Sequence, residues 1–292
     1  MISLKNRILS PSHGDLLWRW LLTIIAMITG VIVVVITVFL FSEASAVLEE
    51  VGWGAFFRDP SWHPQEQFFN LIPMLLGTLS VTVGAVCLAI PLGVGSAIFA
   101  QYYAPRGVAY VYRQLIELLA GIPSVVYGFW GLVVLVPLIN RFQAPGTSLL
   151  AGMVILTLMI LPTVALTAEA SFEEVPLEYR QGAIALGLSK WAMIRGVILP
   201  VAKSGVMTGF ILATGRALGE TMAVLMVCGN VVQVPDSFFA PVRTLTANIA
   251  LEMAYATGNH RSALFVSGLW LMGAIALMVL IAEIMRDQNV KL

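Results

Sequence analysis

Two ionisable side chains lie inside an otherwise apolar stretch of the chain. Arg216 and Glu220 belong to residues 204–230, SGVMTGFILATGRALGETMAVLMVCGN. A helix brings residues four apart onto one face, so the spacing predicts an Arg216–Glu220 ion pair. An arginine at mid-membrane depth costs about 3 kcal/mol and needs a partner or a water-filled path. The pair indicates either a polar pathway or a contact that only locks helix packing, and the pathway is favoured because intramembrane charges are usually functional.

Three further polar side chains are candidates for the same pathway. Glu117 precedes Gly121-Ile122-Pro123, a sequence that breaks or kinks a helix. Glu117 either faces the pathway or anchors a helix end among lipid headgroups. Ser124 and Thr221 are weaker candidates, because hydroxyls in membrane helices usually bond to their own backbone.

Signatures of catalysis are missing from the sequence. It has no Gly-Lys pair and therefore no nucleotide-binding P-loop, and its three histidines lack the spacing of metal ligands. The two cysteines, Cys87 and Cys228, lie in apolar runs and predict no disulfide. These absences favour a transporter or channel subunit that holds no cofactor or metal and has no energy source of its own.

The composition predicts an all-α polytopic membrane protein. Of 292 residues, 59% are hydrophobic and 11% charged, with mean hydropathy +0.91, whereas soluble domains carry about 25% charged residues. The formal net charge of zero argues against a nucleic-acid binder, which needs a basic face. A span takes about 20 helical residues. Six apolar runs are long enough, near Trp18–Phe41, Ile72–Ala100, Leu115–Ile139, Leu149–Thr167, Val206–Cys228 and Ala263–Ile284.

Two of these runs are predicted to be irregular. Pro91 and Gly93 should bend the second run or end it before Ala100, and Gly121–Pro123 should interrupt the third run in mid-membrane. No strand precedes the Gly93-Val94-Gly95 sequence, so it indicates close helix packing rather than a nucleotide-binding loop.

The distribution of Lys and Arg predicts that both termini lie in the cytoplasm. In that orientation four of the 16 basic residues lie outside and Arg216 lies within a span. The other eleven lie inside, namely Lys5, Arg7, Arg19, Arg106, Arg113, Arg180, Lys190, Arg195, Lys203, Arg286 and Lys291. The reversed orientation would invert this bias and is rejected.

The largest inside segment, residues 171–204, is predicted to hold two short helices. Pro176 to Leu186 suits the first helix, Gly187 interrupts it, and Ser189 can cap a second helix that runs toward Leu199-Pro200. We refer to residues 178–190 as the knob. Two short helices that meet at a glycine can fill a groove on a partner, or they can rest on lipid headgroups, and the residues alone leave both open.

A motif in this segment resembles the EAA motif of ABC importer permeases, E-A-A-x3-G-x9-I-x-L-P. The matching residues keep its spacing and depart from it at the first two letters and at the isoleucine. In that family the segment docks onto the ATPase subunit, and the resemblance implies the same for the knob. Gly182 in place of alanine weakens the helix by about 1 kcal/mol. The residues so implicated are Glu178, Gln181, Gly182, Ala183, Gly187, Leu199 and Pro200.

The chain from about residue 68 onward resembles the PstC-type permeases of phosphate-specific ABC importers. The resemblance is carried by residues 117–132, ELLAGIPSVVYGFWGL, by residues 215–224, GRALGETMAV, and by residues 244–252. It implies a type I importer permease fold in a bacterial inner membrane. It also implies a sister permease as heterodimer partner, two ATPase subunits that bind Mg-ATP, and an external phosphate-binding protein. Residues 1–68 would form the N-terminal tail, first span and outer loop, and residues 69–292 the permease core with five spans.

The candidate residues are compatible with phosphate. Arginine presents a planar fork of donors and stays charged at any working pH. Glu220 would either accept hydrogen bonds from the P–OH groups that sulfate lacks, or orient Arg216 and offset its charge. Permeation of another oxyanion such as sulfate or molybdate stays an alternative, as does a passive channel or a membrane-embedded signalling subunit.

Overall fold

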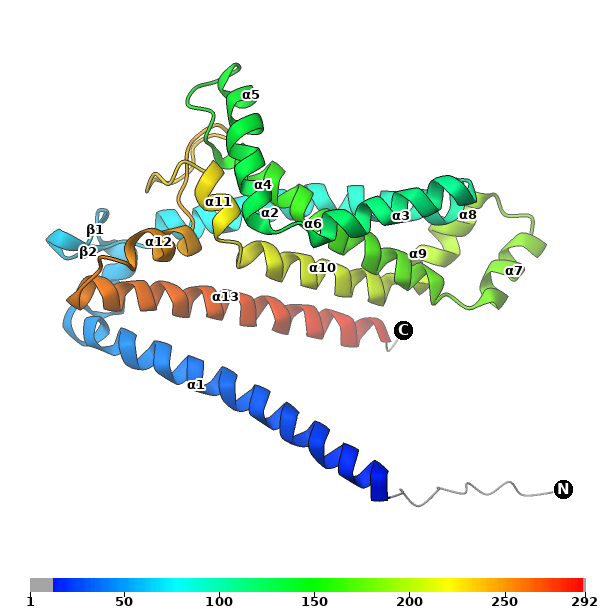
Figure 1. Ribbon diagram of the computed structural model, residues 1–292, viewed down its shortest axis with the longest axis horizontal. Coiled ribbons are helices and arrows are strands. Elements are labelled where there is room, and N and C mark those ends of the chain that lie inside the picture. Colours follow the sequence, from blue (N-terminus) through cyan, green and yellow to red (C-terminus); the bar gives the residue numbers. More distant parts are fainter. Residues whose placement is uncertain (1–12, 291–292) are drawn as a thin grey trace.

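Long helices make up most of the fold, because apolar segments can satisfy their backbone hydrogen bonds within a membrane only as helices or closed barrels. The computed structural model describes residues 13–290. Lys5, Arg7 and Lys291, which enter the predicted charge distribution, lie outside the described residues. The long helices lie roughly along one axis in Figure 1. They are α1 (His13–Arg58), α2 (Ile72–Ile98), α3 (Arg106–Gly121), α6 (Leu149–Glu173), α10 (Lys203–Leu218) and α13 (Gly258–Val290).

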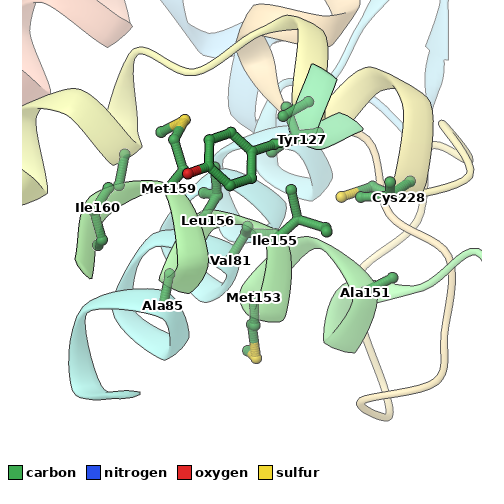
Figure 2. Packing of buried hydrophobic residues seen from close by; sticks show 14 of the residues in the cluster. Val81, Ala85, Tyr127, Ala151, Met153, Ile155, Leu156, Met159, Ile160 and Cys228 are labelled. Atoms are coloured by element: carbon green, nitrogen blue, oxygen red, sulfur yellow. The ribbon is translucent and has the colours of Figure 1, made fainter. Parts of the chain in front are cut away.

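The core is formed where α6 packs between α2 and α10. Figure 2 shows its buried side chains, with Ile155 and Leu156 of α6 beside Val81 of α2. Close approach depends on glycine: a Cβ at Gly93 would lie 2.7 Å from the side chain of Val164, and one at Gly84 would overlap Met153. The prediction that Gly93 marks close helix packing is confirmed.

Helix α1 contributes little to this core. Its C-terminal half packs on α13 through edge-to-face contacts of Phe39 with Phe265 and of Phe57 with Trp270, and Gly52, at φ 73°, kinks its last turns. Its N-terminal half diverges from α13 in Figure 1 and exposes apolar side chains all round, as a lipid-facing helix does.

Within residues 13–290, four helices are long and apolar enough to cross a membrane, or up to six if each of two bent pairs is one span. The predicted interruption of the third run is confirmed, because α3 ends at Gly121 and the chain turns by 95°. It continues as α4 (Ser124–Trp130), a π-helical turn η3 (Gly131–Leu135) and α5 (Val136–Asn140). The second run follows one of its two predicted alternatives, because α2 passes Pro91 but ends at Ile98, before Ala100, and is followed by the π-helical turn η2 (Phe99–Tyr103).

A small hairpin and a short helix cover the end of the bundle opposite the knob (Figure 1). Strand β1 (Trp62–His63) pairs antiparallel with β2 (Phe68–Phe69) across the 3-10 turn η1 (Pro64–Glu66). Beside them, α12 (Leu245–Glu252) lies against the start of α13. We call this the hairpin end.

One buried carboxylate ties the hairpin end together. Glu252 receives hydrogen bonds from Arg243 at 2.6 Å and from Trp62 at 2.9 Å, and its Oε2 lies 2.8 Å from Nε2 of His260. These partners come from β1, the loop before α12 and the first turn of α13. Arg243 also donates to Oδ1 of Asn248 at 3.0 Å. The network fixes the loops through a single acceptor group.

Replacing Glu252 with alanine should therefore destabilise the protein by about 3 kcal/mol, because Arg243 would remain largely buried without its carboxylate. We expect a clear fall in the melting temperature of the detergent-solubilised protein. The control is Glu66→Ala, which removes an exposed acid from the same end and should leave the melting temperature unchanged. Equal melting temperatures for Glu252→Ala and wild type would contradict the assigned role.

Candidate functional site

Two interrupted helices pack together and form the candidate site. The first break separates α3 from α4 at residues 122–123, and the second separates α10 from α11 (Met222–Val227) at residues 219–221. Helices α4 and α11 lie so close that a Cβ at Gly128 would be 2.9 Å from the Cα of Ala223. The glycine therefore allows the two short helices to touch along their backbones.

The predicted Arg216–Glu220 ion pair is wrong. The four-residue spacing would pair the two side chains only in one continuous helix over Val206–Cys228, but α10 ends at Leu218, between the two residues. Among the ion pairs formed within residues 13–290, none includes Arg216 or Glu220. Because of the break, the two side chains no longer have the relative positions that residues four apart have in a continuous helix.

Glu220 instead stabilises the break that it occupies. Its Oε1 accepts a hydrogen bond of 3.0 Å from the amide of Ala223, in the first turn of α11. Its own carbonyl accepts a 2.7 Å hydrogen bond from the hydroxyl of Thr246, at the start of α12. The hydroxyl of Thr221 lies 3.3 Å from the carbonyl of Gly219. Glu220 and Thr221 thus satisfy backbone groups that the missing helical turn would have paired.

Arg216 is exposed in the last turn of α10. Tyr127 on α4, whose hydroxyl donates a 2.8 Å hydrogen bond to the carbonyl of Leu119 across the first break, belongs to the same buried cluster as Ala217, the residue after Arg216. This cluster therefore brings the first break and the last turn of α10 together. The result is a guanidinium without a carboxylate partner beside two irregular segments.

The side chains of Glu117 and Ser124 lie near the first break but form no polar contact with Arg216. Glu117 is exposed on α3, where its carboxylate accepts a 3.3 Å hydrogen bond from Gln114. Ser124 is half-buried at the first position of α4. Neither side chain forms a hydrogen bond or ion pair with Arg216, so their place in a pathway stays a prediction.

The predicted shape of the knob is confirmed. Helix α7 (Leu177–Ala185) ends at a Schellman motif in which Gly187 has φ 71° and Leu188 donates to the carbonyl of Ala183 at 3.1 Å. Ser189 caps α8 (Lys190–Met193) by accepting from Ala192 at 3.2 Å. The chain continues through the π-helical turn η4 (Ile194–Ile198) into α9 (Leu199–Val201). In Figure 1, α7 projects from the end of the bundle.

The surface of the knob suits a docking partner. Of the residues implicated by the EAA-like motif, Glu178, Gln181, Gly182 and Gly187 are exposed, whereas Ala183 is buried. The apolar side chains of Leu177, Ile184 and Leu186 are also exposed, by 64%, 67% and 80%. Leu199 is half-buried and Pro200 exposed at the base of the segment.

One ionic cluster near the knob was not anticipated from the sequence. Arg113 of α3 contacts Glu169 at 2.6 Å and Glu173 at 3.2 Å on α6. The feature of the sequence that could have indicated this cluster is Glu169, an acidic residue only two positions beyond the predicted end of the fourth apolar run. Among residues 13–290, no three His, Cys, Asp or Glu side chains converge as a metal site requires.

Comparisons with known proteins agree with this architecture. Residues 89–286 match the family described as binding-protein-dependent transport system inner membrane component. The probable ABC transporter permease protein YqgH of Bacillus subtilis is 38% identical over 95% of this chain and 89% of its own length. The phosphate transport system permease protein PstC of Mesorhizobium japonicum is 35% identical over 86% of this chain and 83% of its own length.

A solved structure matches over nearly the whole chain. It is a bacterial alginate ABC transporter in complex with an alginate pentasaccharide-bound periplasmic protein, with a TM-score of 0.66. The match covers 96% of this chain and 98% of that one at 13% identity. At that identity the likeness establishes the fold and carries nothing about substrate.

The role found for Glu220 can be tested by two substitutions. Glu220→Ala removes the acceptor for the Ala223 amide and should lower the stability by about 1 kcal/mol, as loss of a helix cap does. Glu220→Gln retains a carbonyl oxygen at the same place and should lose much less. Thermal unfolding of the solubilised protein distinguishes the two, and equal losses would show that the cap is not what Glu220 contributes.

Proposed function

The chain belongs to the family of binding-protein-dependent transport system inner membrane components, and we propose that it carries inorganic phosphate through an ATP-driven importer. That it is an ABC importer permease with the type I permease fold follows from the family and from the fold. Phosphate as the substrate is the proposed part. The observation that carries it is the exposed guanidinium of Arg216 beside two helix breaks.

Arg216 has the chemistry to recognise phosphate during passage. Its planar fork of donors matches two phosphate oxygens, and its charge persists at any working pH. No carboxylate of residues 13–290 pairs with it, so an arriving anion does not have to displace a competitor. The similarity to phosphate permeases of the PstC type supports this choice of anion.

The proposed complex contains three other kinds of component. A sister permease forms a heterodimer with this chain, an external phosphate-binding protein docks at the hairpin end, and one of the two ATPase subunits binds the knob from the cytoplasm. Mg-ATP, held by the ATPase subunits, supplies the energy for alternating access. Both termini of this chain then lie on the cytoplasmic side of the inner membrane.

In this cycle the residues of the chain have separate tasks. The exposed apolar side chains of α7 fill a groove on the ATPase and follow its closure. Helix α10 follows α9 after a 70° bend and carries Arg216 in its last turn, so displacement of the knob reaches the guanidinium through α8, η4, α9 and α10. Arg216 binds phosphate delivered from outside and releases it when the pathway opens inward.

Labelled-phosphate uptake tests the proposal. Vesicles containing this chain, its sister permease, the ATPase and the binding protein should take up phosphate only with ATP, and sulfate should compete weakly. Arg216→Ala should reduce uptake roughly 10- to 100-fold, because a charge-assisted bidentate contact is lost. The control is Arg141→Ala, which removes an exposed arginine from the loop after α5 and should leave uptake unchanged.

Absence of ATP-dependent phosphate uptake by the intact complex would overturn phosphate as the substrate. Preferred uptake of sulfate or molybdate would assign another oxyanion, and flux without ATP would indicate a channel. In the same assay, Glu220→Gln keeps the cap and removes the charge. Weaker discrimination against sulfate would then indicate that Glu220 accepts hydrogen bonds from phosphate P–OH groups, whereas unchanged discrimination would exclude that role.

The docking role of the knob has its own test. Proline requires φ near −65°, which is incompatible with the value of 71° at Gly187, so Gly187→Pro should remove the Schellman turn. We expect loss of the ATP hydrolysis that loaded binding protein stimulates, with normal membrane insertion. Gly187→Ala keeps the turn at a cost of about 1 kcal/mol and should retain most of the stimulation. Transport at the wild-type rate by Gly187→Pro would refute the docking assignment.

A further inference from the structure

Two cations of the knob converge on one pair of aromatic residues. Arg180 lies on α7 and Lys190 begins α8, so each of the two knob helices contributes one. The aromatic residues, Tyr102 and Tyr103, are the last two of η2, the π-helical turn that ends the second span. None of these four residues belongs to the EAA-like motif.

Arg180 makes two contacts at the base of the knob. Its guanidinium carbon lies 5.8 Å from the ring centroid of Tyr102, within the range of a cation–π interaction. Its Nη2 donates a hydrogen bond to the carbonyl of Phe172, near the C-terminus of α6. Tyr102 and Phe172 are themselves in contact, with centroids 6.3 Å apart. Arg180 therefore joins α7 to both η2 and α6.

Lys190 reaches the same turn from the other helix. Its Nζ lies 5.8 Å from the ring centroid of Tyr103 and 3.5 Å from the carbonyl oxygen of Tyr102. Cation–π contacts occur at both helices of the knob and at neighbouring residues of η2. The knob is thus fixed to the inner end of the second span at two points rather than being able to pivot about one.

We propose that Arg180 and Lys190 are positioning residues that transmit movement of the knob to the second span through Tyr102 and Tyr103. This inference rests on the proposed function, in which the knob follows the ATPase. Helix α7 is otherwise largely exposed. Along the chain it follows α6 and is joined to α10 through α8, η4 and α9. Among the residues that the structure describes, no other hydrogen bond or cation–π contact joins the knob to α2 or η2, although α2 lines the core with α6.

The ring of Tyr102, and not its hydroxyl, makes the contact. Within residues 13–290 that hydroxyl is buried without a hydrogen-bond partner. Tyr102→Phe therefore preserves the surface on which Arg180 rests, whereas Tyr102→Leu removes it. This difference gives a conservative variant that separates the cation–π contact from general packing at the site.

The test uses the complete complex in vesicles and measures phosphate transported per ATP hydrolysed. Arg180→Ala and Tyr102→Leu should each lower this ratio about fivefold, and the effect of the double variant should fall well short of the product of the two, because both substitutions remove the Arg180–Tyr102 contact. Lys190→Ala should lower the ratio to a smaller extent. Tyr102→Phe should match wild type. Arg195→Ala removes an exposed cation from the same segment and should also match wild type.

A second readout does not depend on the substrate. Hydrogen exchange at the amides of residues 101–104, measured on the assembled complex, should be faster in Arg180→Ala and Tyr102→Leu than in wild type or Tyr102→Phe. A normal transport ratio and normal exchange in Arg180→Ala would overturn the inference, as would equal damage by Tyr102→Phe and Tyr102→Leu. If wild type shows no phosphate uptake while the exchange pattern holds, the phosphate assignment fails and the link between knob and span stands.

Discussion

A helix interrupted inside a membrane must find new partners for the backbone groups it frees, and the arrangement of this protein depends on how two such interruptions are satisfied. At the first, the hydroxyl of Tyr127 donates to the carbonyl of Leu119. At the second, Thr246 donates to the carbonyl of Glu220, whose carboxylate accepts from Ala223. Thr246 belongs to neither broken pair, so the second break also fixes the start of α12.

These requirements explain which features the sequence could predict. The first break contains Pro123, which removes a donor and excludes the helical conformation for the preceding residue, so a local pattern sufficed. Gly187 and Ser189 are likewise local signals for a helix end and a helix start, and both were confirmed. The EAA-like motif located the knob because all of the motif's residues lie within one short segment of the chain.

The second break could not be found in this way. Its sequence, Gly219-Glu220-Thr221, contains no proline and continues an apolar pattern that favours one helix. The interruption is stabilised by Thr246, 26 residues further along the chain, and by packing of Gly128 against Ala223. The predicted Arg216–Glu220 pair requires one continuous helix, and the break between Leu218 and Met222 removes the helical spacing that would place the two side chains on one face. All six predicted runs fall on helices, but within residues 13–290 four helices are long and apolar enough to span a membrane, or up to six if each bent pair is one span. The second bent pair joins Lys190–Val201 to Lys203–Leu218, so the predicted fifth run, Val206–Cys228, is interrupted at Leu218.

The position of α10 connects the two regions that the proposed function requires. With 16 residues it is about 24 Å long, and it begins after a 70° bend next to α9 and ends at the second break. Gly205 and Gly209 leave no room for a Cβ against Ser171 and Thr167 of α6, so the two helices meet on small side chains. In the proposed cycle α10, which has irregular backbone at both ends, carries Arg216 in its last turn. The carboxylate of Glu220 instead bonds to α11, and the carbonyl of Glu220 accepts from Thr246 at the start of α12. The break between the two residues therefore leaves the arginine of α10 without a carboxylate from the residue that a continuous helix would have placed beside it.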